Sequence, residues 1–271
     1  MQAASREAYV AAAERLEAIS ADATKLEAIA DDVLAVAGLL RREIGLRRAL
    51  ADPARSGQER AGLLRTILGK QVGAEALDVL GTLVDGRWAR PSELLDATER
   101  LGVDALLGSA DKRGTLGDVE DQLFRFAKIV QGDPQLAGVL SDPTVEAARR
   151  ATVVRALLEG RADPVTIRLA ELSLAGFGGR SFDASLARLV ELAAERRDRH
   201  VAYVTVAAEL TEEEERRLGA RLSEMYRRDV SLKITVEPEV LGGMRVQVGH
   251  DLYDGTVARR LTETRNALAG R

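Results

Sequence analysis

The spacing of apolar residues divides the chain into a long helical part and a short part that contains strands. From the N-terminus to about His200, apolar residues recur at helical spacing, as Phe182, Leu186 and Leu189 do. After that point successive side chains alternate between two faces, as they do in a strand. The pattern predicts a mainly α protein, with an N-terminal helical bundle followed by a small α/β C-terminal domain.

Three segments of the C-terminal part have the period of a strand, and they are residues 201–206, 231–236 and 244–248. Gly242 and Gly243 precede the third segment and supply backbone angles that a side chain would forbid. The second and third segments are therefore expected to be a connected pair of strands, joined through this glycine turn. A phosphate-binding loop is disfavoured because no Gly-Lys-Ser/Thr sequence or helix start follows the glycines.

Two helices complete the predicted C-terminal part. The first lies between the first two strands, where Thr211 and Glu214 have the spacing of a capping box. The second is expected to begin near Gly255. The apolar stripe of the first helix consists of Leu218, Leu222, Met225 and Tyr226, and that of the second consists of Val257, Leu261 and Leu268. The predicted order is strand, helix, strand, strand, helix.

The helical part contains a sequence repeat with an offset of 90 residues. The repeat includes an Asp-Pro pair, a following arginine and the apolar pattern upstream of both. The matched pairs are residues 26–40 with 116–130, residues 50–53 with 140–143, and Arg60 with Arg150. One constant offset over about 40 positions favours an internal duplication over a shared helical period.

The repeat divides the chain into three predicted domains. They are a first helical unit at residues 1–108, a second helical unit at residues 109–199 and the C-terminal domain at residues 200–271. The segment from Gly108 to Gly117 is rich in glycine. It is expected to form either a bend or a flexible hinge between the two helical units.

Composition limits both the core and the partners. Hydrophobic residues make up 46% of the chain but aromatic residues only 3%, so the cores must be built mainly from Ala, Leu and Val. The formal net charge is −4, which disfavours nucleic acid as the principal partner. The longest apolar run, residues 33–40, is far shorter than the roughly 20 residues of a membrane-spanning helix. We expect no direct membrane span.

No strong catalytic constellation is visible in the sequence. The absence of cysteine excludes disulfides, thiolate metal sites and a cysteine nucleophile. His200 and His250 are the only histidines, and neither has a metal-ligand partner at helical spacing. The acidic run at residues 212–215 fits the first turn of a helix, where carboxylates face free amide groups. We expect no catalytic residue, no metal site and no cofactor.

The end of the chain resembles a known family, the ATP synthase delta subunit family, which includes the mitochondrial oligomycin-sensitivity-conferring protein. The residues similar to its C-terminal signature are Leu241, Gly242, Gly243, Met244, Gly249, Asp254 and Gly255. Near the N-terminus, Arg6, Tyr9 and Ala12 resemble the opening helix of the family. The family normally has one helical bundle before its C-terminal domain, so this chain carries an extra copy. Which copy, or which mixture of both, takes the family's usual position is left open.

The resemblance implies a non-catalytic subunit of the proton-translocating ATP synthase. In the family, the helical domain holds N-terminal segments of the alpha subunits, and the C-terminal domain binds the b subunit of the peripheral stalk. Such a subunit lies at the top of the catalytic head, peripheral to the cytoplasmic face of the cell membrane, and keeps the head from turning with the rotor. By family position, the candidate wall of the alpha-binding groove consists of Arg6, Tyr9, Ala12 and Leu16, and the candidate stalk contact of residues 241–249 and the last helix.

Two other functions stay open at this point. A cytosolic helical adaptor or regulatory module that has kept only the fold would bind soluble partners rather than the membrane-bound ATPase. An enzyme that uses the small C-terminal domain is a more distant alternative, which a bound metal, nucleotide or cofactor would favour. For the extra helical copy, we expect either a longer contact with the stalk or the replacement of part of a neighbouring subunit.

Overall fold

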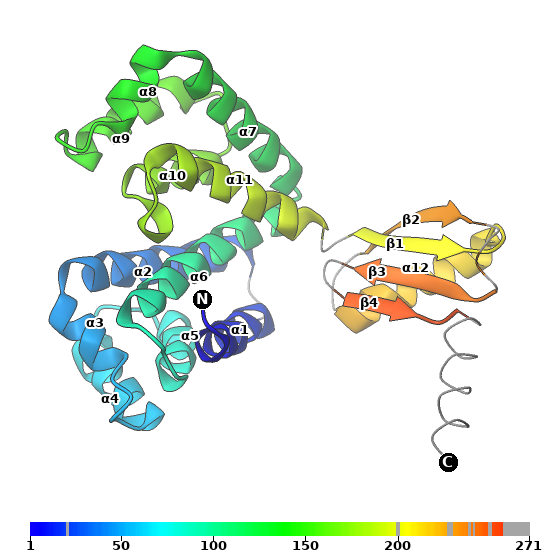
Figure 1. Ribbon diagram of the computed structural model, residues 1–271, viewed down its shortest axis with the longest axis horizontal. Helices are drawn as coiled ribbons and strands as arrows, with labels where there is room; N and C mark the ends of the chain where they lie inside the picture. The colour runs from blue at the N-terminus through cyan, green and yellow to red at the C-terminus, as the bar shows by residue number, and fades with distance from the viewer. Residues whose placement is uncertain are drawn as a thin grey trace. The chain divides into compact units, whose positions relative to one another are not determined.

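Figure 1 shows the computed structural model, which describes residues 1–19, 22–198, 201–226, 230–237, 240, 242–248 and 251–256. The chain divides into two compact units, Met1–Glu191 and Leu192–Arg271. The first unit is built from helices, and the second contains a small sheet. The prediction of a mainly α protein with a small α/β C-terminal domain is confirmed. The division of residues 1–199 into two domains stays a prediction.

Consecutive helices form the first unit, and their starts follow local rules. Ser56 and Glu59 form a capping box before α4. Proline occupies the first turn of α6, α8 and α10, where its missing amide leaves no hydrogen bond unmade. The elements are α1 (Ala3–Ala18), α2 (Ala23–Arg42), α3 (Ile44–Leu50), α4 (Gly57–Leu68), α5 (Ala74–Asp85), α6 (Pro91–Lys112), α7 (Leu116–Gly132), α8 (Pro134–Ser141), α9 (Ala147–Leu158), α10 (Pro164–Leu174), the 3-10 helix η1 (Phe177–Gly179) and α11 (Phe182–Asp198), which ends in the second unit.

The helices recur along the chain at the offset seen in the sequence. α3 and α8 begin at residues 44 and 134, α4 and α9 at 57 and 147, and α5 and α10 at 74 and 164. α2 and α7 end at residues 42 and 132. Each pair differs by 90 residues, which supports a duplication. We refer to α1–α5 as the first set of helices, and to α7–α10 with η1 as the second set.

A buried arginine has the same role in both sets. Arg60 of α4 and Arg150 of α9 are 4% and 8% exposed. Each guanidinium donates to one carbonyl in the loop before its own helix and to another at the end of the next helix. These acceptors are the carbonyls of Arg55 and Val84 for Arg60 (2.5 and 2.8 Å), and of Val145 and Leu174 for Arg150 (3.0 and 3.1 Å). The repeated arginine therefore satisfies backbone groups that the helices leave without partners.

The long helix α6 serves both sets. At the 90-residue offset, the counterpart of α1 is a segment inside α6. The contacts agree, because α10 contacts α6 as its counterpart α5 contacts α1. α6 also contacts α2 and α3 in the first set and α7 and η1 in the second. As a result, every residue from Leu101 to Ala110 is buried. Gly102 lets α2 and α6 pack closely, because a Cβ atom there would lie 2.5 Å from the side chain of Leu34 on α2, which would have to move.

The bend expected between Gly108 and Gly117 is a short turn after Lys112. Gly108 lies inside α6, and Gly114 has a φ of 72°. The amide of Thr115 donates to the carbonyl of Ala110 at 2.9 Å, and the amide of Gly114 donates to that of Asp111 at 2.9 Å. This is the Schellman arrangement that ends helices at a left-handed glycine. A capped helix end thus connects α6 to α7.

A four-stranded sheet with α12 on one face forms the second unit (Figure 1). Its elements are β1 (Val201–Val206), α12 (Glu212–Tyr226), β2 (Ser231–Val236), β3 (Met244–Val248) and β4 (Asp251–Asp254). The strand order is β2-β1-β3-β4, with β1 parallel to β2, β3 antiparallel to β1, and β4 antiparallel to β3. The core under α12 consists of Ala202, Val204, Val206, Leu222, Val230, Val246 and Val248.

The second unit corrects three sequence predictions. β2 and β3 do not pair, because the α12 crossover makes β2 parallel to β1 and β1 lies between them. β4 is absent from the prediction because it is short and bounded by Asp251 and Asp254, which suggest turns. Met225, placed in the apolar stripe of α12, is 54% exposed. The capping box of Thr211 and Glu214 is confirmed, and the predicted last helix lies outside the described residues, beyond Thr256.

Candidate interaction surfaces

Neither a metal centre nor a membrane span is found in the part of the chain that the structure describes. No group of three or more His, Cys, Asp or Glu side chains there could hold a metal ion. None of its helices is both long enough and apolar enough to cross a membrane. His200 and His250 lie outside the described residues.

The four candidate residues on α1 do not share one surface. Ala12 and Leu16 are 0% and 3% exposed and belong to the core. Tyr9 is half-buried, and its hydroxyl donates to Oδ2 of Asp104 on α6 at 2.5 Å. Arg6 alone of the four is exposed. The predicted groove wall is therefore mostly the inner face of α1.

The outer face of α1 carries an exposed apolar residue that the sequence prediction omits. Val10 is 43% exposed, and it lies two residues, or about 200° of helix rotation, from the buried Ala8 and Ala12. Its position between two alanines of the inner stripe is the signal that could have identified it. Val10 lies one helical turn from Arg6, so the two side chains share the exposed outer face of α1.

A cavity of about 590 Å³ opens at the N-terminal end of α1. Its walls come from Ala4 and from the segments 53–57 and 85–89. Trp88 lies in this wall but is only 7% exposed, and its Nε1 donates to the carbonyl of Leu83 at 3.1 Å. Trp88 is therefore a core residue with one edge at the cavity rather than an exposed contact.

The described residues of the family motif meet at one end of the sheet. Gly242 and Gly243 have φ angles of 72° and 81°, which confirms the predicted glycine turn. A Cβ atom on Gly243 would lie 2.4 Å from the carbonyl oxygen of Gly255, and the Gly255 amide donates to the carbonyl of Met244 at 2.9 Å. Leu241 and Gly249 lie outside the described residues. The motif holds two backbone segments against each other, so its role here is structural.

Beside this turn, the second unit has an apolar groove of about 670 Å³ along α12, which we call the α12 groove. Leu210, Leu218 and Met244 line it and pack only partly against the core. Charged residues of α12 form its rim, and these are Glu214, Arg217, Arg221 and Glu224. An open apolar groove with a charged rim is typical of a site that receives another chain segment.

Three buried carboxylates on α6 hold the neighbouring helices. Glu93, Glu99 and Asp104 are 2%, 1% and 8% exposed. A hydrogen bond from the hydroxyl of Ser5 on α1 is the main reason that the pKa of Glu93 lies below its usual 4.5. Asp104 accepts a hydrogen bond from the hydroxyl of Tyr9, which is also on α1. Two of the three acids on α6 therefore bind α1.

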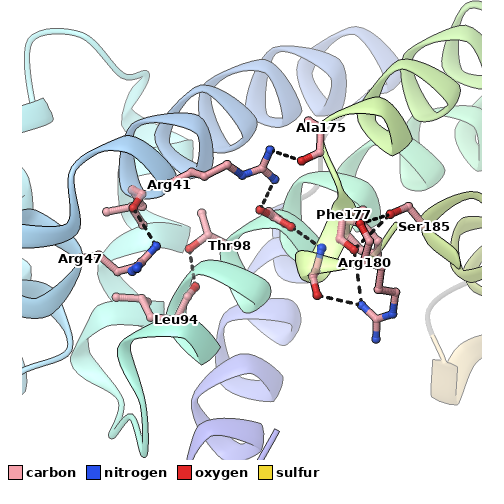
Figure 2. Close-up of polar contacts among 11 residues, drawn as sticks. Arg41, Arg47, Leu94, Thr98, Ala175, Phe177, Arg180 and Ser185 are labelled. Carbon is pink, nitrogen blue, oxygen red and sulfur yellow. Dashed lines mark hydrogen bonds and ion pairs between the residues drawn. The ribbon is translucent and has the colours of Figure 1, made fainter. Parts of the chain in front are cut away.

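The third carboxylate, Glu99, joins the two sets of helices. Its Oε1 accepts from Nη2 of Arg41 on α2 at 2.5 Å, and its Oε2 accepts from the backbone amide of Gly178 in η1 at 2.7 Å. Arg41 reaches across to the end of α10, where its Nη1 donates to the carbonyl of Ala175 at 2.7 Å (Figure 2). Because the Glu99 side chain is only 2% exposed, little water weakens these contacts.

The pKa values of Asp96 and Tyr226 lie above their usual range. Burial, with a further contribution from the Glu99 carboxylate, raises the pKa of Asp96 on α6 above 3.8. In the second unit, burial and hydrogen bonds to Tyr253 and Asp251 raise the pKa of Tyr226. Tyr226 donates to Oδ2 of Asp251 at 3.0 Å, which ties α12 to the edge strand β4.

Comparison with known proteins identifies the family. The sequence model described as ATP synthase delta (OSCP) subunit matches residues 103–268. Over 274 residues the chain is 63% identical to the ATP synthase subunit delta of Salinispora arenicola (strain CNS-205), with 100% of both chains covered. The chain belongs to the ATP synthase delta (OSCP) subunit family. Delta subunits of Salinispora tropica (strain ATCC BAA-916) and Streptomyces griseus subsp. griseus (strain JCM 4626) are 62% and 46% identical, again with 100% of both chains covered.

Membership in the delta family confirms the resemblance seen in the C-terminal signature. A member of this family is a non-catalytic, peripheral-stalk component of the F-type ATP synthase. The relatives match both sets of helices as well as the C-terminal unit. Among solved structures, a chain of the Toxoplasma gondii mitochondrial ATP synthase hexamer matches 62% of this chain and 94% of its own length at 18% identity, with a TM-score of 0.36.

Proposed function

We propose that this delta-family subunit links the alpha subunits of the catalytic head to the b subunit of the peripheral stalk, on the cytoplasmic side of the membrane. The helical unit holds N-terminal segments of alpha, and the C-terminal unit holds b. The link resists the torque of the rotor, so that proton flow drives the catalytic sites elsewhere in the complex. The observation that carries the proposal is full-length similarity to delta subunits, and open surfaces on both units support it.

For the alpha subunits, the first set of helices is the better candidate. The family match begins at residue 103, inside α6, so it covers the second set and the C-terminal unit. The choice between the two sets therefore depends on which of them has an accessible first helix. In the second set the place of α1 is taken by α6, whose residues 101–110 are all buried. The positions of α6 that correspond to Arg6 and Val10, residues 96 and 100, are only partly exposed, so this surface is less open to a partner helix than that of α1. α1 keeps an outer face in water, where Arg6 and Val10 are exposed.

For the b subunit, the open face of the sheet supports the contact. α12 covers one face, while the other presents Tyr203 and Leu252, which are 44% and 56% exposed. Gln247 of β3 lies between them in register, because it pairs with Tyr203 on one side and Leu252 on the other. Arg245 extends this face into the predicted stalk-contact range, residues 241–249. An amphipathic helix laid across the face would bury both apolar side chains.

Calorimetric titration of the full-length chain tests both contacts. We expect peptides of the alpha N-terminus and of the b C-terminus to bind at micromolar concentration. Val10→Glu should weaken alpha binding about tenfold, which is a loss of about 1.4 kcal/mol, by placing a charge at the contact. Leu252→Glu should weaken only the binding of b.

The matched control is Ile129→Glu, which places the same charge on α7 of the second set, where Ile129 is 58% exposed. This variant should bind both peptides like the wild type. If Ile129→Glu rather than Val10→Glu weakened alpha binding, the contact would lie on the second set. Binding of neither peptide by the wild-type chain would contradict the proposed function.

A further inference from the structure

The cavity at the N-terminal end of α1 has arginines on several of its walls. Arg55 and Arg87 line it, and Arg48 lines an adjoining cavity of about 370 Å³ that shares Pro53 and Trp88 with it. The three arginines are exposed, and they come from α3, from the loop before α4 and from the loop after α5. We refer to the two adjoining cavities together as the arginine cavity.

The positive charge of the arginine cavity is open to a ligand. Arg55 lies 3.6 Å from Asp52, but both side chains are exposed, so water weakens this pair. In the part of the chain that the structure describes, the side chains of Arg48 and Arg87 have no ion-pair partner. The whole lining contains four arginines and two aspartates, so its net charge is positive.

The internal repeat shows that the fold does not require the three exposed arginines. The buried Arg60 of the lining has Arg150 as its counterpart, and both bind backbone carbonyls. The exposed arginines have uncharged counterparts in the second set, which are Gly138 for Arg48, Val145 for Arg55 and Phe177 for Arg87. The second set forms the same helices without these charges. Folding therefore does not account for the exposed arginines of the first set.

The chemistry of the lining fits a peptide with several carboxylates. The planar guanidinium of arginine matches a carboxylate with two parallel hydrogen bonds. Pro53, Trp88 and Ala89 add apolar atoms to the same wall. A cavity of about 590 Å³ with charged and apolar walls fits a peptide segment better than one small anion. Nucleic acid is disfavoured by the formal net charge of −4.

We infer that the arginine cavity binds an acidic segment of a partner protein. Carboxylates of the segment pair with the three exposed arginines, and its apolar atoms cover the edge of Trp88. This site is separate from the outer face of α1, because Ala4, which lines the cavity, lies two residues, or about 200° of helix rotation, from Arg6. The inference therefore does not depend on the proposed alpha contact.

Trp88 makes the binding observable, because it is the only tryptophan of the chain and it lines the cavity. Titration of the full-length chain with a hexaglutamate peptide at low salt should change the Trp88 fluorescence until the site is saturated. Added salt should weaken the binding by screening the charges. Arg55→Gln and Arg87→Gln should each weaken it about threefold, which is typical of the loss of one exposed ion pair.

The matched control is Arg149→Gln, which removes the same charge from α9 of the second set, where Arg149 is exposed. This variant should bind hexaglutamate like the wild type. Equal weakening by Arg149→Gln and Arg87→Gln would overturn the inference, because the overall charge rather than the cavity would then attract the peptide. A wild-type chain whose Trp88 fluorescence did not respond would also overturn it. So would inorganic phosphate or a single-stranded oligonucleotide that bound as tightly as the peptide.

Discussion

The junction at Glu99 predicts a specific cost when its charge is removed. Glu99→Gln keeps the size of the side chain but leaves one acceptor oxygen for two donors, the guanidinium of Arg41 and the amide of Gly178. A hydrogen bond to a charged group contributes roughly 1.5–3 kcal/mol, and an unsatisfied buried donor costs a comparable amount. Arg41 is 34% exposed and regains water, which lowers the cost. We expect a loss of about 2 kcal/mol in the free energy of unfolding.

Thermal unfolding and hydrogen exchange both measure this loss of stability. For a unit of this size a loss of 2 kcal/mol lowers Tm by about 4–8 °C, which circular dichroism at 222 nm detects. If the loss is local to the junction, hydrogen exchange of the Gly178 amide should accelerate about 30-fold, because each 1.4 kcal/mol corresponds to a factor of ten. The exchange measurement separates opening of η1 from a general loss of stability.

Glu191→Gln is the matched control. Glu191 accepts from Nη1 of Arg188 at 2.7 Å, but its side chain is 62% exposed, so its removal should cost less than about 0.5 kcal/mol. If Glu99→Gln and Glu191→Gln gave the same Tm, Glu99 would not stabilise the junction between the two sets of helices.

Three further predictions concern the fold. Arg60→Met should lower the free energy of unfolding by about 3–4 kcal/mol, and Arg150→Met should lower it by less. The reason is that Arg60 donates five hydrogen bonds to carbonyls and Arg150 donates three. Equal urea midpoints for the wild type and Arg60→Met would contradict this prediction. Gly243→Ala should destabilise the C-terminal unit by about 1–3 kcal/mol. Gly219→Ala inside α12, where a Cβ meets only Leu232 at 3.9 Å, should instead stabilise it by about 0.5–1 kcal/mol. Thermal unfolding in which both variants shifted Tm in the same direction would contradict this prediction. Because the pKa of Asp96 is raised, the folded state binds its proton more tightly than the unfolded state, and stability falls as the pH rises above 3.8. Asp96→Asn should therefore raise Tm at pH 7 and lose this advantage below pH 3.8, and a gain that is constant with pH would exclude this explanation.

The repeat is visible in the sequence because its turns need particular residues. Each copy requires proline after aspartate, and each requires an arginine that reaches two sets of carbonyls, so Arg60 and Arg150 stand at one offset. A helix shared by the two sets leaves no such mark. α6 contacts helices on several sides, so its apolar residues form no single stripe, and its buried acids appear as ordinary surface charges until their partners are known.

The C-terminal unit shows the same limit. Alternation identifies β1, β2 and β3 because each has a buried face, but it carries no information on which strands are neighbours. The parallel pairing of β1 with β2 comes from the crossover through α12. On α1, helical spacing identifies the inner residues Ala12 and Leu16, and the same spacing places Val10 on the outer face, away from α5 and α6, which contact α1.

The central claim, that this chain couples the catalytic head to the stalk, is tested most directly by ATP-driven proton pumping in membrane vesicles that lack the delta subunit. Addition of the purified full-length chain together with the catalytic head should restore pumping, and the Val10→Glu and Leu252→Glu variants should restore less. Full pumping without the chain, or no restoration by the wild-type chain, would contradict the claim.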